Sequence, residues 1–240
     1  MLSPEAARDG VTPPARSDGE RELKFAVLDG RVDMARRWLE RICRPDPEFP
    51  AAVVWTIYYD TPHLASLGEK INSDYLKRKI RVRWYSDLQG RAAGPAFVEA
   101  KLRVGNRRVK ARARLPFAAD ELAGWDLQDP RFREFPLLLQ EQGLGVRDLW
   151  QPVMLIRYRR DRFVDPLSGS RVSLDSDIAG AAVNPRFVSA PDFTPVGLSV
   201  LEIKGASDEL PLALRGLLQL GIRKRSFSKF LAVYAHMTGV

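Results

Sequence analysis

The sequence has few of the residue types that build covalent or metal-based scaffolds. It contains one cysteine, Cys43, in 240 residues, which excludes an internal disulfide and a cysteine-based zinc site. Two histidines, His63 and His236, are too few for a histidine-rich metal site. No run approaches the ~18 apolar residues that span a bilayer, because a proline and an arginine interrupt the apolar stretch 210–220. The first residues lack the apolar core of a secretory signal, so we expect a cytoplasmic protein.

Positive charge, in contrast, is abundant and unevenly distributed. Lysine and arginine number 38 against 30 aspartates and glutamates, so the formal net charge is +8. Residues 75–115 alone hold 13 basic residues and two acidic ones, Asp87 and Glu99, a local net charge of +11. Hydrophobic residues make up 45% of the chain, which is enough to bury a core and excludes disorder over most of its length. The first expectation is a folded protein with a polyanionic partner.

The hydrophobic pattern predicts many strands with helices between and after them. Residues 1–18 are rich in Pro, Ala and Gly without periodicity, and we predict a disordered tail followed by a single domain over residues 19–240. Strands are predicted at 20–27, 53–59, 79–85, 97–104, 108–115, 153–163, 171–178 and 199–204, and helices at 32–42, 63–72, 210–220 and 227–236. This order is typical of an α+β domain with one large antiparallel sheet or barrel.

Six of the predicted strands are amphipathic, with charged side chains on one face and apolar side chains on the other. In the strand 79–85, for example, Lys79, Arg81 and Arg83 alternate with apolar residues. The other five charged faces hold Glu20, Glu22 and Lys24; Glu99, Lys101 and Arg103; Arg108, Lys110, Arg112 and Arg114; Arg171, Ser173 and Asp175; and Glu202 and Lys204.

A solvated sheet face would explain any one of these strands. Several neighbouring strands with like charges, however, repel one another unless an anion lies between them. Closure of the sheet would turn the charged faces into a barrel interior and the apolar faces outward against the helices. We therefore predict an antiparallel β-barrel tunnel with a polar, cationic interior for a linear polyanion and helices packed outside.

The few carboxylates on the charged faces allow two interpretations. Divalent cations such as Mg²⁺ or Mn²⁺ bind carboxylate oxygens together with substrate phosphates, whereas salt bridges would only neutralise neighbouring Lys and Arg. We favour a salt bridge for Glu99, whose face also carries Lys101. For Glu202 and the pair Glu20 and Glu22 we favour metal binding.

An ordered series of motifs runs along most of the chain. Residues 20–24 have the pattern ExExK, and YYDT (58–61), KRKIRVRWY (77–85), FVEAKLR (97–103), a P-x5-Y-x-R-x2-F segment (152–163), RVSLDSDI (171–178), VLEIK (200–204) and SFSKF (226–230) follow. From about residue 20 to residue 234 this series resembles the VTC domain, the polyphosphate polymerase branch of the triphosphate tunnel metalloenzymes.

The resemblance implies a β-barrel tunnel in which basic residues hold a nucleotide triphosphate and a growing polyphosphate. The phosphate-binding residues that it implies are Lys24, Arg81, Arg83, Lys101, Arg160, Arg171 and Lys229, to which the charged faces add Lys79 and Lys204 as candidate substrate ligands. It also assigns metal binding to Glu202. One position departs from the family pattern: relatives often have lysine where this chain has Ser226. Either one phosphate contact is lost, or Lys224 or Arg225 supplies it.

The activity that the resemblance implies is transfer of the γ-phosphate of ATP to inorganic polyphosphate, with Mn²⁺ or Mg²⁺ as the cofactor. Arg81, Arg83, Lys101 and Glu202 are the expected catalytic residues, because phosphoryl transfer needs positioning and charge stabilisation rather than a protein nucleophile.

Three alternatives remain open. The same site could hydrolyse triphosphate or a nucleoside triphosphate, or the domain could bind polyphosphate without catalysis. Cyclisation of ATP is a third chemistry of the superfamily, and no residue favours it. Nucleic acid is a less suitable partner, because the basic strands lack the exposed aromatic residues that stack bases. Any membrane partner would be a separate polypeptide.

Overall fold

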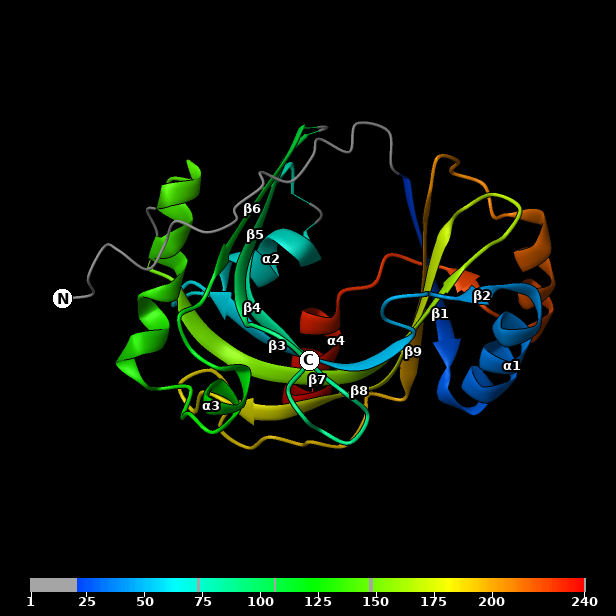
Figure 1. The fold of residues 1–240 in the computed structure, drawn as a ribbon. Helices are drawn as coiled ribbons and strands as arrows, with labels where there is room; N and C mark the ends of the chain where they lie inside the picture. Colours follow the sequence, from blue (N-terminus) through cyan, green and yellow to red (C-terminus); the bar gives the residue numbers. More distant parts are fainter. Residues whose placement is uncertain (1–20, 73, 106, 147–148, 240) are drawn as a thin grey trace.

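The computed structural model describes residues 21–72, 74–105, 107–146 and 149–239 and is built around one antiparallel sheet (Figure 1). The strand order is β10-β1-β9-β8-β7-β3-β4-β5-β6, and β2 pairs with β7. The strands are β1 (Arg21–Leu28), β2 (Arg44–Pro45), β3 (Ala51–Asp60), β4 (Leu76–Ser86), β5 (Phe97–Val104), β6 (Arg107–Arg114), β7 (Gln151–Val164), β8 (Arg171–Val183), β9 (Leu198–Gly205) and β10 (Arg223–Lys224). The predicted strands are confirmed with small shifts of their ends, whereas the tail 1–18 and Glu20 lie outside the described residues.

The helices connect and cover these strands. They are η2 (Asp29–Arg31), α1 (Val32–Ile42), α2 (Ala65–Ile71), α3 (Ala119–Ala123), η3 (Pro130–Arg133), η4 (Phe135–Gln142), η5 (Leu212–Leu220) and α4 (Lys229–Thr238). The prediction of α1 is confirmed to the residue, since Val32, Ala35 and Leu39 form its buried stripe. The stretch predicted as a helix at 210–220 is instead the 3₁₀ helix η5. None of the described helices combines the length and the apolar character that crossing a bilayer requires.

The sheet bends into an open trough (Figure 1). The short strand β10 and the strand β6 form its two edges, and no backbone pairing within the described residues joins them. Closure into a barrel is therefore not confirmed. The two walls approach through side chains instead: Lys101 Nζ on β5 is 4.0 Å from Glu22 Oε2 on β1.

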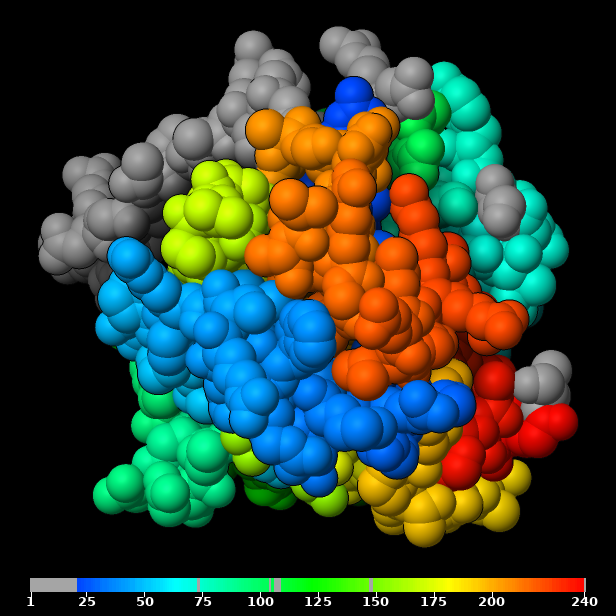
Figure 2. All heavy atoms as spheres, turned by 90° about the vertical axis from the view of Figure 1, so that its right-hand side faces the viewer, coloured from blue at the N-terminus to red at the C-terminus, as the bar shows by residue number. Residues whose placement is uncertain are grey.

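Two apolar cores lie on the outer side of the trough. One places Phe132 and Leu139, from η3 and η4, against the outer face of β4 and β5. The other places Leu39 of α1 and Leu214 of η5 against the outer face of β1, β8 and β9. Figure 2 shows α1 and η5 side by side over this second wall. These two groups confirm the prediction that helices cover the apolar strand faces from outside.

A third apolar core lies inside the trough and corrects the expectation of a wholly polar interior. Helix α4 occupies the curve of the sheet (Figure 1), where Phe230 stacks on Tyr58 at 5.1 Å between ring centroids. Val54, Ile156 and other inward residues of β3 and β7 complete this core. These buried side chains provide an apolar floor against which α4 packs. The charged residues therefore occupy only part of the concave face.

Candidate functional site

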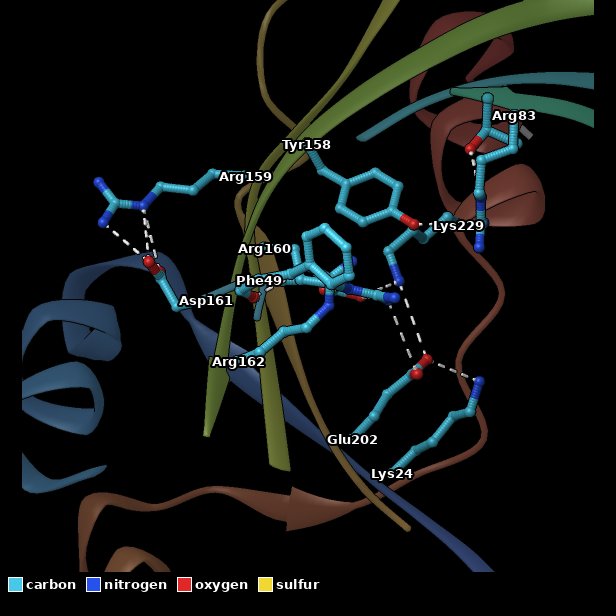
Figure 3. Close-up of polar contacts among 12 residues, drawn as sticks. Lys24, Phe49, Arg83, Tyr158, Arg159, Arg160, Asp161, Arg162, Glu202 and Lys229 are labelled. Carbon is cyan, nitrogen blue, oxygen red and sulfur yellow. Dashed lines mark hydrogen bonds and ion pairs between the residues drawn. The ribbon is translucent and has the colours of Figure 1, made fainter. Parts of the chain in front are cut away.

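A network of buried charges lies where β1, β7, β8 and β9 meet the first residue of α4 (Figure 3). Asp175 is completely buried and accepts hydrogen bonds from Nε and Nη2 of Arg160, both at 2.6 Å. Its Oδ2 atom also lies 2.6 Å from Lys229 Nζ. Glu202 Oε1 lies 2.9 Å from Lys24 Nζ and 3.9 Å from Lys229 Nζ, and Oε2 lies 3.8 Å from Arg160 Nη2. Three cations thus share two carboxylates.

The electrostatics of this network keep all of its members charged. Burial raises the pKa of Glu202, but Lys229, Lys24 and Arg160 together lower it well below its ordinary value. The pKa of Asp175 is lowered in the same way: Arg160 and Lys229 outweigh its burial. Burial lowers the pKa of Lys229, but Asp175, Tyr158 and Glu202 together raise it above its ordinary value. At neutral pH the network therefore carries a net positive charge.

Tyr158 extends the network toward β4. Its hydroxyl accepts a hydrogen bond from Arg83 Nη2 at 3.2 Å, and Arg83 Nε donates to Thr56 Oγ1 at 3.2 Å. Lys229 Nζ lies 4.6 Å above the Tyr158 ring and the Arg160 guanidinium lies 5.4 Å from the ring centre. The buried tyrosine therefore positions three cations through its hydroxyl and its ring.

The opposite wall contributes a second ion-pair group. Arg81 on β4 stands opposite Glu99 on β5, with Arg81 Nη2 2.7 Å from Glu99 Oε2. Arg112 Nε on β6 lies 3.5 Å from Glu99 Oε1. Burial raises the pKa of Glu99, but Arg81 and Arg83 lower it to about 2. These contacts agree with the interpretation of Glu99 as a salt-bridge partner.

Lys79 and Lys101 stand directly opposite each other on β4 and β5. Burial, followed by the charges of Lys24, Lys70, Arg81 and Lys101, lowers the pKa of Lys79 to about 7. Lys101 is about half exposed, at 47% of its side-chain surface, and reaches toward Glu22. This pair of lysines increases the positive potential of the wall.

Two of the three candidate metal ligands are described, and they lie close together. Glu22 Oε1 is 3.5 Å from Lys24 Nζ, which also contacts Glu202, so one ammonium group bridges two carboxylates from neighbouring strands. Glu20 lies outside the described residues. Within the described ranges no cluster of three or more His, Cys, Asp or Glu side chains is placed to hold a metal. Two oxygen donors fit Mg²⁺ or Mn²⁺ when substrate phosphates supply further ligands.

The remaining predicted ligands lie farther along the same face. Arg171 and Lys204 are paired in register, one step beyond the pair Ser173 and Glu202. Arg171 is exposed, so it lies at the end of the charged face rather than within the buried network. Lys224 is paired in register with Phe25, whose side chain belongs to the outer core. Lys224 therefore points away from the charged face. It does not supply the phosphate contact that the resemblance assigns to a lysine at position 226.

Two elements of the site were missed by the sequence interpretation. Asp175 was placed on the charged face but not in the site, although its alternation with Arg171 and Ser173 is the signal that could have identified it. Lys70 belongs to α2, and its Nζ donates a hydrogen bond to Ser226 Oγ at 2.6 Å. No strand periodicity points to a helical residue, so only the fold reveals this contact.

The chain is similar to one protein family in sequence and to solved structures in fold. The sequence matches the VTC domain family over residues 20–238. A proposed adenylyl cyclase from Hippeastrum, described as having a dominant triphosphatase activity, is similar in structure, with a TM-score of 0.53 and 15% identity over 90% of this chain and 96% of that one. A proposed adenylate cyclase from Bacillus halodurans has a TM-score of 0.49 and 12% identity, over 88% of this chain and 95% of that one. The search among curated proteins found no match.

Proposed function

Since the chain belongs to the VTC domain family, we propose that it is a phosphotransferase that moves the γ-phosphate of ATP to a growing inorganic polyphosphate chain. Family membership supports an enzyme that acts on phosphate groups. The observation that carries the proposal is the excess of positive charge on one face. Described cations of that face outnumber the carboxylates beside them: Lys24, Lys79, Arg81, Arg83, Lys101, Arg112, Arg160 and Lys229 lie beside Glu22, Glu99, Asp175 and Glu202.

The cations would bind and orient the phosphates. Arg81, Arg160 and Lys229 are held in place by carboxylates before any substrate arrives, so little side-chain conformational entropy is lost on binding. A charge-assisted hydrogen bond to phosphate contributes about 1.5–3 kcal/mol. Several such bonds along a chain of phosphates favour a linear polyanion over a single phosphate.

The reaction needs no protein nucleophile. A terminal oxygen of the polyphosphate chain attacks the γ-phosphorus of ATP in line, the bond to the oxygen that bridges the β- and γ-phosphates breaks, and ADP leaves. Arg83 and Lys101 would stabilise the charge that develops on the transferring group and the leaving ADP, as preorganised donors do in other phosphoryl transfers. Arg171 and Lys204 would contact the chain at the end of the charged face.

A divalent cation would be held by Glu22 and Glu202, with Mn²⁺ or Mg²⁺ as the candidates. When bound, it would neutralise negative charge on the phosphate oxygens. Lys24 bridges the same two carboxylates, so its ammonium group would move toward phosphate when a metal binds. Glu20 stays a predicted third ligand. A single domain over residues 19–240 and a cytoplasmic location likewise stay predictions from the sequence.

Hydrolysis of a triphosphate is the second candidate function. It is favoured by the similarity in fold to the Hippeastrum protein with its triphosphatase activity. The same cations would bind the substrate, and water would replace the polyphosphate chain as the acceptor.

One assay separates the two reactions. The protein is incubated with ATP and Mn²⁺ or Mg²⁺, and long polymer is resolved on a gel while free phosphate is measured. Long polymer that forms with the wild type but not with Arg81→Ala supports the phosphotransferase. Stoichiometric phosphate without polymer supports the hydrolase, and binding of polyphosphate with neither product supports a binding module.

A further inference from the structure

Two lysines on the inner side of the trough differ from Lys24 and Lys229 in having no carboxylate partner among the residues that the structure describes. Lys70 lies in the last turn of α2, and Lys79 lies on β4. Neither forms an ion pair with a carboxylate of the residues that the structure describes, whereas Lys24 and Lys229 each do. A partnered cation is already partly neutralised. An unpartnered one gains the most from an incoming anion.

The charged groups that surround these two lysines are positive. Lys79 is influenced by Lys24 on β1, Lys70 on α2, Arg81 on its own strand and Lys101 directly opposite on β5. Lys70 is influenced by Lys77 and Lys24. Like charges placed opposite each other across a sheet are destabilising. The fold therefore concentrates positive charge between α2 and the wall formed by β4 and β5.

A hydroxyl group completes the arrangement. Lys70 Nζ donates a hydrogen bond to Ser226 Oγ at 2.6 Å, which ties α2 to the segment that precedes α4. Ser226 is exposed, so its own hydroxyl hydrogen can donate to a ligand from solvent. Two ammonium groups and one hydroxyl from three separate segments present donors without a competing carboxylate.

We propose that Lys70, Lys79 and Ser226 form a phosphate-binding subsite that holds one phosphate group of a linear polyphosphate. The inference rests on the proposed function, because it assigns a further contact for the same polyanion. These donors match phosphate oxygens and offer no apolar or stacking surface for a nucleobase, so the subsite takes an inorganic chain.

The protonation of Lys79 supports this assignment. Burial and the neighbouring cations hold the pKa of Lys79 near 7, and burial followed by Lys77 lowers the pKa of Lys70. A bound phosphate places negative charge beside Lys79 and offsets the neighbouring cations. The pKa of Lys79 then rises, and the protein takes up a proton. At pH 7 the uptake should be about half a proton per bound chain.

The test measures binding of inorganic tripolyphosphate by calorimetry in two buffers with different ionisation enthalpies. Lys70→Gln should weaken binding about tenfold, which is the loss of one charge-assisted hydrogen bond. Lys70→Arg should stay within about twofold of the wild type, because it keeps the charge. Lys224→Gln is the matched control, since it removes an exposed lysine from the opposite face of the sheet.

A second pair of variants distinguishes a specific loss of binding from a loss of folding. Ser226→Asp would give Lys70 an internal anion and should weaken binding by more than tenfold without removing a lysine. Lys79→Gln should abolish the proton uptake. Binding by Lys70→Gln and Ser226→Asp that equals the wild type, while Arg81→Ala is weakened, would overturn the subsite alone. Failure of the wild type to bind tripolyphosphate would overturn the subsite and the proposed function together.

Discussion

Replacement of Asp175 by asparagine should strongly destabilise the protein although the side chain keeps its size. The aspartate has no exposed surface and makes three contacts of 2.6 Å, two with Arg160 and one with Lys229. Loss of its charge would leave these two cations with Glu202 as the nearest carboxylate, at 3.8 and 3.9 Å. Removal of one partner of a buried ion pair costs about 3–5 kcal/mol. Because asparagine can still accept a hydrogen bond, we expect about 3 kcal/mol.

The measurement is the free energy of unfolding from urea titration, followed by tryptophan fluorescence. Asp177→Asn is the matched control. It lies two residues along the same strand, is exposed and adopts a left-handed backbone conformation that asparagine tolerates. The control should change stability by less than about 0.5 kcal/mol.

The pH dependence provides an independent check of the same reasoning. The pKa of Asp175 is lower in the folded protein than in the unfolded chain. Its contribution to stability is therefore fully present above about pH 4 and is lost as the pH falls through the lower folded value. The stability difference between wild type and Asp175→Asn should shrink in strong acid. Equal stability of the two proteins at pH 7 would show that Asp175 does not hold the network together.

Three further results are expected. Arg81→Ala should reduce turnover about 100-fold without unfolding the protein, whereas Arg41→Ala on the outer helix α1 should leave turnover unchanged. Full polymer synthesis by Arg81→Ala would contradict the proposal that Arg81 binds the phosphates. Glu202→Gln should lose stimulation by Mn²⁺, measured as activity against metal concentration, whereas Glu121→Gln on α3 should keep it. Normal stimulation of Glu202→Gln would count against metal binding by Glu202. The pKa of Lys79 is about 7 in the folded protein and near its ordinary value of 10.5 in the unfolded chain, so the stability of the ligand-free protein should fall as the pH is lowered from about 10 to about 7 and level off below 7. A Lys79→Gln variant with the same pH profile of stability would disprove this effect.

Much of the site could be recognised from strand periodicity. Arg81, Arg83 and Lys101 alternate with apolar residues, and side chains two positions apart on a strand share one face. Local sequence therefore predicts which residues lie together on each strand. The register confirms that Lys24 and Glu202 share a face across β1 and β9, as their alternation suggested.

The partners within that face depend on long-range pairing. Asp175 contacts Arg160 because β8 pairs with β7, and Lys229 reaches both carboxylates because α4 packs into the trough. The contact of Lys70 with Ser226 joins residues 156 positions apart. A strand pattern has no information about these distances, because any register that buries the apolar faces satisfies it equally.

The amino-acid order by itself determined that charges and apolar groups separate onto opposite strand faces, since that follows from backbone geometry and burial alone. Tertiary structure decided that the sheet stays open at its edges, that an apolar helix occupies part of its inner side, and which cations receive a carboxylate. The physical reason is that charges interact through space: their pairing is set by how distant strands and helices pack, which no local pattern contains.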